Sequence, residues 1–144
     1  MKSTLIILSI FLLAFITSSP ADEIAGTWQT SGDDWAHIQI YKSGEKFHGK
    51  IVKLKNPLDE HGKPKADDNN PDVSKRSKPA IGLQIISNFI YDGKNEWTGG
   101  TIYDPESGDT YKCYMWLDNK GHLNVRGYIG ISLIGRTEKW KRVS

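Results

Sequence analysis

The chain has 144 residues, a formal net charge of +2 and a single cysteine, Cys113. The near-neutral charge argues against nucleic acid as the main partner, because binding to the phosphate backbone needs a concentrated basic face. A lone cysteine excludes an internal disulfide, and the length is that of one domain.

Residues 1–21 have the features of a secretory signal peptide. Lys2 gives a positive start, residues 5–16 are almost continuously apolar, and Ser-Pro-Ala at 19–21 supplies small residues for a signal peptidase. The apolar run is shorter than the roughly 20 residues that a membrane span requires. We therefore predict cleavage directly after this triplet, export to the periplasm or the medium, a single domain over residues 22–144, and no stable membrane span after cleavage.

The first strands of the mature chain follow a period-two alternation. Pairing Ile38 and Ile40 with Ile51 and Gly49 keeps one face of the predicted hairpin apolar, as its register must. The histidine of each strand then lies on the outer face, and the two are too far apart along the hairpin to share a metal ion.

Residues 56–79 interrupt the strand pattern with four prolines, four aspartates and three asparagines. A loop of this length in one domain is usually functional or mobile. Asp59, Asp67 and Asp68 do not have the spacing of a calcium loop, which needs ligands at alternate positions, a central glycine and a closing glutamate. No metal site is predicted here or elsewhere in the chain.

The remaining segments return to short strands with turn signals between them. Asp92-Gly93 is a tight-turn pair, and Gly99-Gly100 inside a strand predicts a bulge where a sheet curves. The predicted strands are residues 26–30, 36–41, 47–54, 82–91, 96–104, 110–117, 123–129 and 136–143.

Eight short strands without a helical period predict an all-β fold. We expect an eight-stranded antiparallel β-barrel with one long loop between its third and fourth strands. A two-sheet sandwich is the alternative that periodicity leaves open.

The late strands carry arginine and aromatic side chains at alternate positions. Pairing residues 110–117 with 123–129 gives one apolar face, containing Cys113 and Met115, that should point inward. The opposite face carries Tyr114, Trp116, Arg126 and Tyr128 and is too aromatic for an ordinary solvated surface. The long loop covers this face, a partner covers it, or the barrel is inverted and the face lines a polar cavity. These three arrangements remain open.

Gly26-Thr-Trp28 resembles the Gly-x-Trp signature of the first strand of lipocalins, in which a late-strand arginine packs over the tryptophan. Arg136 and Arg142 are both candidates for that arginine. A longer pattern resembles the bacterial family known as domain of unknown function 2147. It comprises Asp67 with Asn70-Pro71, Gly82-Leu83, residues 97–105 (Trp-Thr-Gly-Gly-Thr-Ile-Tyr-Asp-Pro), Gly108, Tyr111, residues 125–130 (Val-Arg-Gly-Tyr-Ile-Gly), Gly135-Arg136-Thr137 and Trp140. The resemblance implies an exported, lipocalin-like (calycin-type) barrel and names no reaction.

These patterns favour a barrel that binds a small amphipathic or anionic molecule and has no cofactor. Arg126 and Arg136 are expected to hold an anionic group together, since two guanidinium forks suit carboxylate or phosphate. The predicted ligand-binding residues are Arg126, Tyr128, Arg136, Tyr114, Trp116, Trp97 and Tyr103, and the predicted barrel-closing residues are Trp28, Trp140 and Arg142.

Two other functions compete with ligand binding. One is an envelope module that binds another protein, or a second copy of the chain, through the aromatic face. The other is an enzyme, which we do not expect, because no histidine shares a segment with a plausible nucleophile and no Gly-x-Ser-x-Gly elbow occurs.

Overall fold

The computed structural model describes residues 18–127 and 137–144. Two short 3₁₀ helices, η1 (Pro20–Ile24) and η2 (Val73–Lys75), accompany eight β-strands within these residues. The strands are β1 (Gly26–Gln29), β2 (Ala36–Ser43), β3 (Lys46–Leu54), β4 (Gln84–Tyr91), β5 (Glu96–Asp104), β6 (Asp109–Leu117), β7 (Leu123–Gly127) and β8 (Thr137–Arg142).

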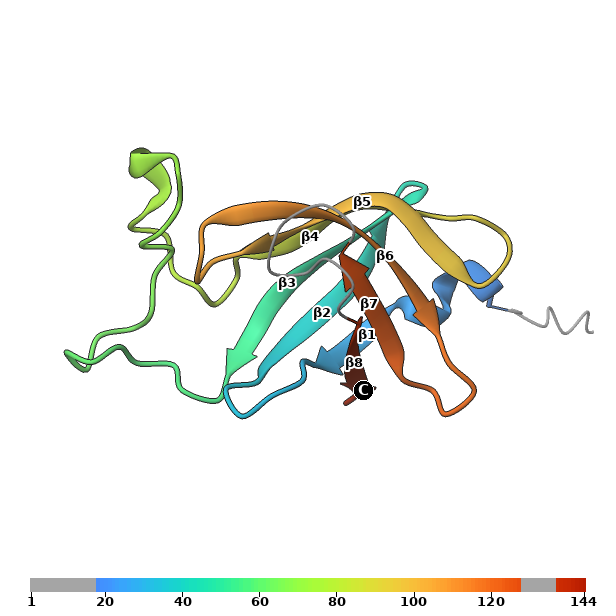
Figure 1. Ribbon diagram of the computed structural model, residues 1–144, viewed down its shortest axis with the longest axis horizontal. Helices are drawn as coiled ribbons and strands as arrows, with labels where there is room; N and C mark the ends of the chain where they lie inside the picture. The colour runs from blue at the N-terminus through green and yellow to red at the C-terminus, as the bar shows by residue number, and fades with distance from the viewer. Residues whose placement is uncertain (1–17, 128–136) are drawn as a thin grey trace, which may run out of the picture.

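The strands form one closed antiparallel barrel in the order β1 to β8, and β1 pairs with β8 through Trp28 and Arg142 (Figure 1). The predicted all-β barrel is thus confirmed, and the sandwich alternative is wrong. Every described strand lies within two residues of its predicted limits. The predicted strand residues 128, 129 and 136 and the apolar run at 5–16 lie outside the described residues.

The predicted register of the first hairpin is confirmed, because Ile40 pairs with Gly49 and Ile38 with Ile51. The predicted bulge in β5 is also present: the register with β6 shifts between Trp97 and Gly100. A Cβ atom at Gly100 would collide with the ring of Phe89 on the neighbouring strand β4, so glycine is required where the sheet bends.

Inward-facing side chains fill the barrel with an apolar core. Trp28 and Trp97 have 0 % of their surface exposed and Trp140 only 2 %. The other buried core residues are Ile24, Ile38, Ile40, Phe47, Ile51, Ile85, Ile86, Phe89, Cys113, Met115, Leu123 and Val125. Burial raises the pKa of the Cys113 thiol to about 12, so the thiol stays protonated and packs as a small apolar side chain.

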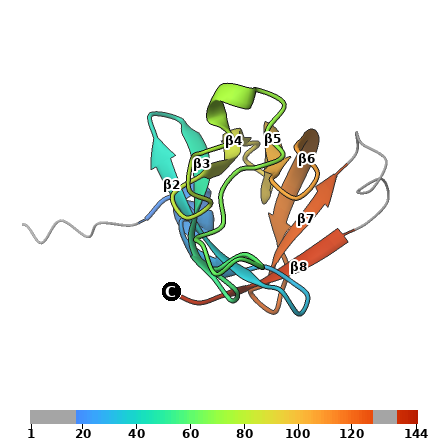
Figure 2. The same cartoon turned by 90° about the vertical axis from the view of Figure 1, so that its left-hand side faces the viewer.

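One end of the barrel is closed by η1, and the long loop lies at the other end (Figure 1). Viewed from the loop end, residues 55–83 cross in front of the barrel (Figure 2). We call these the closed end and the loop end. No helix among the described residues has the length and apolar character needed to cross a membrane.

Candidate functional site

The loop between β3 and β4 has its own hydrogen-bonded structure. Two isolated β-bridges, Leu58 with Pro64 and Ala66 with Pro79, fold the loop back on itself. The backbone of Ala80 donates to Lys65, which holds the start and the end of the loop together. A loop anchored in this way can form the fixed wall of a pocket.

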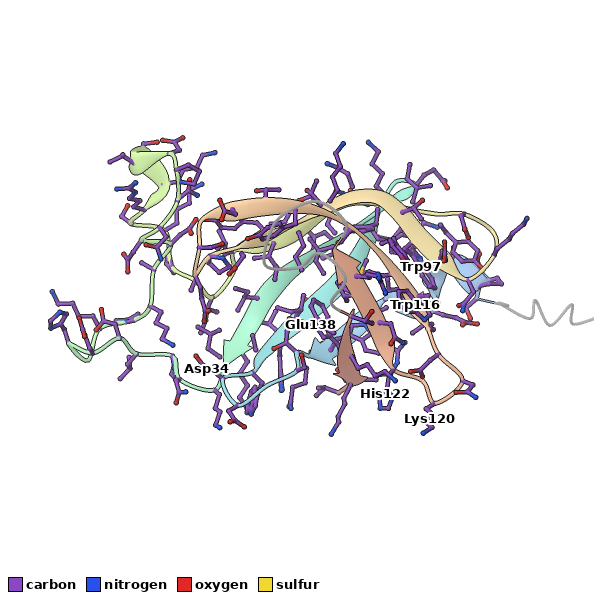
Figure 3. The ribbon with its side chains drawn as sticks, viewed as in Figure 1. Asp34, Trp97, Trp116, Lys120, His122 and Glu138 are labelled. Carbon is purple, nitrogen blue, oxygen red and sulfur yellow. The ribbon has the colours of Figure 1, made fainter. Side chains whose placement is uncertain are left out.

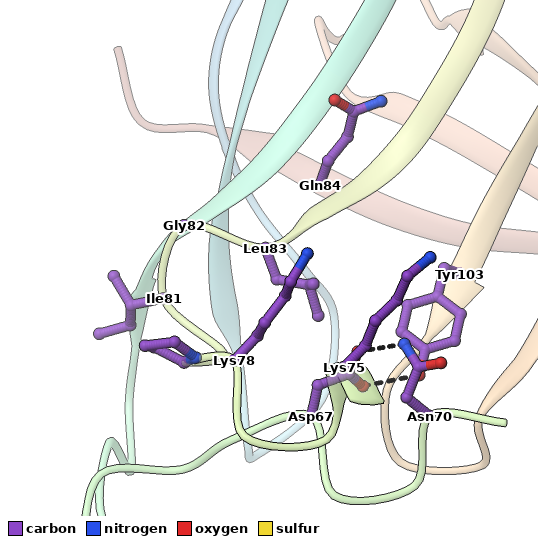
Figure 4. A pocket seen from close by; sticks show the side chains of 10 residues that line it. Asp67, Asn70, Lys75, Lys78, Ile81, Gly82, Leu83, Gln84 and Tyr103 are labelled. Atoms are coloured by element: carbon purple, nitrogen blue, oxygen red, sulfur yellow. Dashed lines mark hydrogen bonds between the residues drawn. The ribbon is translucent and has the colours of Figure 1, made fainter. Parts of the chain in front are cut away.

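Asp67 fixes the loop to the barrel. This carboxylate has 0 % exposure, and each of its oxygens accepts a hydrogen bond. Tyr103 Oη at the end of β5 donates to Oδ1 at 2.6 Å, and Asn70 Nδ2 donates to Oδ2 at 2.7 Å (Figure 4). Burial and the hydrogen bond to Asp67 raise the pKa of Tyr103 to about 12, so its hydroxyl remains a donor at neutral pH.

A second contact joins the same loop to the turn between β5 and β6. Asn69 Nδ2 donates to the carbonyl of Glu106 at 2.8 Å. At Gly108 the φ angle is +76°, and a Cβ atom there would collide with the carbonyl of Asn69. Glycine is therefore needed at this position for both its backbone conformation and the close approach of the loop.

A pocket of about 480 Å³ lies between this anchored loop and the start of β4. Pro79, Ile81 and Leu83 give it an apolar wall, and Leu83 also packs against the barrel core. The full lining comprises Asp67, Asn70, Lys75, Lys78, Pro79, Ile81, Gly82, Leu83, Gln84 and Tyr103.

Two lysines supply the positive charge of this pocket. The side chains of Lys75 and Lys78 extend toward the same side of the pocket as Gln84 (Figure 4). Lys75 Nζ lies 3.9 Å from Asp72, whereas Lys78 forms no ion pair within the described part of the chain. Hydrogen bonds from Ser74, and after them the charges of both lysines, lower the pKa of Asp72. Because the Asp67 oxygens are already occupied, an entering ligand would meet ammonium and amide groups.

The predicted ligand-binding residues do not share one cavity. Trp97 belongs to the core, where its Nε1 donates to the carbonyl of Ala21 at 3.1 Å. Tyr103 lines the loop pocket, with its hydroxyl bound to Asp67. Tyr128 and Arg136 lie outside the described residues, so the expected pairing of Arg136 with Arg126 stays a prediction.

Tyr114, Trp116 and Arg126 lie on the outer surface of the barrel. Their strand neighbours Cys113 and Met115 are buried in the core, as the predicted pairing of β6 with β7 requires. The inverted arrangement, in which the aromatic face lines a polar interior, is therefore wrong. The apolar neighbours, which gain more from burial, take the inner face.

A shallow groove of about 370 Å³ crosses this outer face, and Figure 3 shows Trp116 on its strand. The groove is lined by Lys94, Asn95, Glu96, Tyr114, Trp116 and Arg126. None of these residues belongs to the long loop, so the loop does not cover the aromatic face.

Arg142, one of the two predicted candidates, packs over Trp28, whereas Arg136 lies outside the described residues. Its guanidinium carbon lies 4.2 Å from the centroid of the Trp28 ring. The same group donates to the backbone carbonyls of Ala25 and Glu23. Trp140, two residues before Arg142 in β8, is buried, and its Nε1 donates to Glu138 at 3.0 Å. These contacts tie β8 to η1 and β1.

Sequence reasoning missed Lys75, Lys78 and Gln84 as pocket residues. It weighed a function for Asp67 only as a calcium ligand, although the residue is part of the resemblance pattern, and did not connect it with Tyr103, which lies 36 positions away. No three histidine, cysteine, aspartate or glutamate side chains gather as a metal site within residues 18–127 and 137–144. The signal that could have found the pocket was the resemblance pattern itself, which contains Asp67, Asn70, Gly82, Leu83 and Tyr103.

Comparisons with known proteins agree with this geometry. Residues 26–142 match the family described as "Uncharacterized protein conserved in bacteria (DUF2147)". Protein HP1028 from the human pathogen Helicobacter pylori, described as belonging to the lipocalin family, has a similar structure with a TM-score of 0.73. The two chains are 25 % identical, over 84 % of this chain and 83 % of the other. No curated protein matches the sequence. The chain belongs to the bacterial DUF2147 family, and its fold is a lipocalin-like barrel.

Proposed function

We propose that the protein is an exported, non-enzymatic carrier or sensor of a small anionic amphiphile, which binds in the pocket at the loop end. The observation that carries this proposal is the pairing of an apolar wall, formed by Ile81 and Leu83, with the ammonium groups of Lys75 and Lys78. Ligand sites in proteins are typically apolar clefts in which a few placed polar groups fix the orientation of the ligand.

The chemistry of the pocket suits a molecule with an acidic head and a short apolar tail. The head would lie near the two ammonium groups, which offer both positive charge and hydrogen-bond donors. The tail would cover Leu83, which already contacts the core. The volume of about 480 Å³ lies within the range of small-molecule sites in proteins.

Decanoate, with decanol as its uncharged analogue, can test this proposal by calorimetric titration. Replacing both pocket lysines, as Lys75→Gln with Lys78→Gln, should weaken decanoate binding by roughly tenfold, or about 1.4 kcal/mol. Decanol binding and the melting temperature should change little, because both lysines are exposed and only Lys75 has an ion-pair partner.

The matched control is Lys46→Gln with Lys120→Gln, which removes the same charge from exposed positions away from the pocket. Equal weakening by both double variants would show a general charge effect and contradict the pocket. Absence of decanoate binding by the wild-type protein, together with no acidic amphiphile retained in native mass spectra of protein purified from its own cells, would contradict the proposed function.

Export has a separate test. N-terminal sequencing of protein from the periplasm or the medium should begin at or near Asp22. Recovery of intact Met1 on a cytoplasmic product would contradict it.

A further inference from the structure

The outer groove on β5, β6 and β7 is separate from the loop pocket and has a different chemistry. Two cross-strand pairs build it: Glu96 lies opposite Trp116, and Tyr114 lies opposite Arg126. Lys94 and Asn95, in the turn before β5, complete one edge. All of these groups stand on paired strands or a tight turn, so their positions are set by the sheet.

The aromatic part of the groove is a stacked pair. The ring centroids of Tyr114 and Trp116 are 5.5 Å apart with an angle of 26° between their planes. The three buried tryptophans each donate their indole N–H to an acceptor: Trp28 to Ile24, Trp97 to Ala21 and Trp140 to Glu138. The Trp116 N–H, by contrast, has no acceptor within residues 18–127 and 137–144. This donor is available to a bound molecule.

The polar part of the groove offers donors and acceptors together. Glu96 and Lys94 form no ion pair within the described chain. Arg126 makes one long hydrogen bond, from Nη1 to Thr137 Oγ1 at 3.5 Å. A carboxylate, an ammonium and a guanidinium group therefore surround a half-buried indole, and none of them is tightly engaged by another residue of the described ranges 18–127 and 137–144.

This combination excludes several classes of ligand. A nucleic acid or an acidic peptide would place negative charge against Glu96. A lipid chain would need continuous apolar surface, yet the described residues that line the groove offer two aromatic rings bordered by charged and amide groups. A protein interface of ordinary size buries about 800 Å² on each partner around an apolar centre. None of the large exposed hydrophobic side chains of the described chain (Val52, Leu58, Val73, Ile81, Ile90 and Val143) lines this groove.

We propose that the outer groove binds a saccharide, with a sugar ring stacked on Trp116 and its hydroxyl groups bound by Glu96, Arg126 and the indole N–H. A pyranose has an apolar C–H face and an equatorial rim of hydroxyls. Each hydroxyl both donates and accepts, which matches a site that holds a carboxylate beside cationic donors. The groove volume of about 370 Å³ suits one or two sugar rings. This proposal is independent of the loop pocket.

Calorimetric titration with cellotetraose and with chitotetraose, two neutral β-linked probes, tests it on the intact protein. Saturable binding of at least one probe is expected. Trp116→Ala should weaken that binding by about tenfold, equivalent to roughly 1.4 kcal/mol. Trp35→Ala is the matched control, because Trp35 is also a half-buried outer tryptophan, stacked on His37 at 4.8 Å, and it should leave binding unchanged.

A second measurement on the wild-type protein keeps the test valid if Trp116→Ala fails to fold. The indole ¹⁵N–¹H resonance of Trp116, identified by its loss in Trp116→Phe, should shift with added probe, while those of the three buried tryptophans should not. No binding of either probe up to about 10 mM, ten times a Kd of 1 mM, would overturn the proposal. So would binding that Trp116→Ala leaves intact while the Trp116 resonance does not move. Self-association that Trp116→Ala abolishes, without a response to either sugar, would assign the face to protein contacts and also overturn it.

Discussion

The closed end and the loop end of the barrel use similar residue types in opposite ways. At the closed end, Arg142 is engaged by the Trp28 ring and by two backbone carbonyls. At the loop end, Lys78 extends over a pocket and forms no ion pair with another described residue. A cation that is already satisfied contributes stability, whereas a cation without a partner remains available for a ligand.

The buried or partly buried aspartates of the two ends are both hydrogen-bonded, but they hold different structures in place. Asp118, in the turn between β6 and β7 at the closed end, accepts several hydrogen bonds from its own turn. At the loop end, the two oxygens of Asp67 accept hydrogen bonds from Tyr103 and Asn70 and so hold the pocket wall in place. We therefore expect substitutions at the closed end to change stability alone, and substitutions around the pocket to change binding as well.

Trp28→Ala should have the largest effect on stability. The Trp28 side chain has 0 % exposure, its Nε1 donates to Ile24 at 2.8 Å, and Arg142 covers its ring. Truncating a buried large aromatic residue typically costs about 3–5 kcal/mol of unfolding free energy. Denaturant unfolding monitored by circular dichroism measures this loss. Trp35→Ala is the control. A loss for Trp28→Ala within the range of ordinary surface substitutions, about 0.5 kcal/mol, would show that Trp28 does not contribute to the stability of the core.

Tyr103→Phe should have the next largest effect on stability, and it should also weaken ligand binding in the pocket. Removing the hydroxyl leaves one oxygen of the buried Asp67 carboxylate without its donor, and such a loss costs about 1.5–3 kcal/mol. The loop should then be cut faster by trypsin, since it contains several lysines, and decanoate binding should weaken.

Tyr41→Phe is the control for this effect, because Tyr41 donates to the neutral amide oxygen of Gln84 in an exposed position. A Tyr103→Phe protein with unchanged unfolding free energy and unchanged trypsin cleavage would show that the Asp67 contact does not hold the loop.

Comparing Arg142→Lys with Arg126→Lys separates the closed end from the outer groove. Lysine keeps the charge at Arg142 but loses the planar donors that reach Ala25 and Glu23, together with the stacking on Trp28. We expect a loss of about 1–2 kcal/mol for Arg142→Lys. Arg126→Lys should leave the melting temperature nearly unchanged, because its one described hydrogen bond is long. Equal losses in the two variants would remove the distinction between the two arginines.

The sequence was sufficient to predict the barrel, because each strand obeys one local rule. Alternation fixed which side of β2 and β3 faces the core, and two adjacent glycines marked the bulge in β5. Pairing β6 with β7 likewise put Cys113 and Met115 on one face and Tyr114 and Trp116 on the other, although it left the inverted arrangement open. These are short-range properties that neighbouring residues determine.

The loop pocket could not be predicted in the same way, because it depends on contacts between distant segments. Asp67 meets Tyr103, and Asn69 meets the backbone next to Gly108, only after the barrel has closed. Composition suggested an irregular loop there, and nothing in its spacing indicated which carboxylate would be buried. The position of Arg142 over the Trp28 ring depends in the same way on how β8 pairs with β1.

Asp118→Asn should have the smallest effect on stability, and this effect should be recognisable by its dependence on pH. Hydrogen bonds from the backbone of His122, from Asn124 and from the backbone of Lys120 lower the pKa of Asp118 from its ordinary 3.8 to about 2. Because the folded pKa is the lower one, the stabilisation is fully present above pH of about 4 and is lost as the pH falls toward 2.

Melting temperatures of the wild-type protein and of Asp118→Asn, measured from neutral pH downward, test this sign. The wild-type protein should melt at the higher temperature near neutrality, and the two curves should converge between pH 4 and about 2, as the carboxylate is protonated. Asp33→Asn is the control, because the exposed Asp33 side chain accepts no hydrogen bond within the described chain and should give no such convergence. A difference between wild type and Asp118→Asn that persists unchanged to the acidic limit would mean that the carboxylate charge does not stabilise the turn, and that the closed end gains its stability from the tryptophans and Arg142 alone.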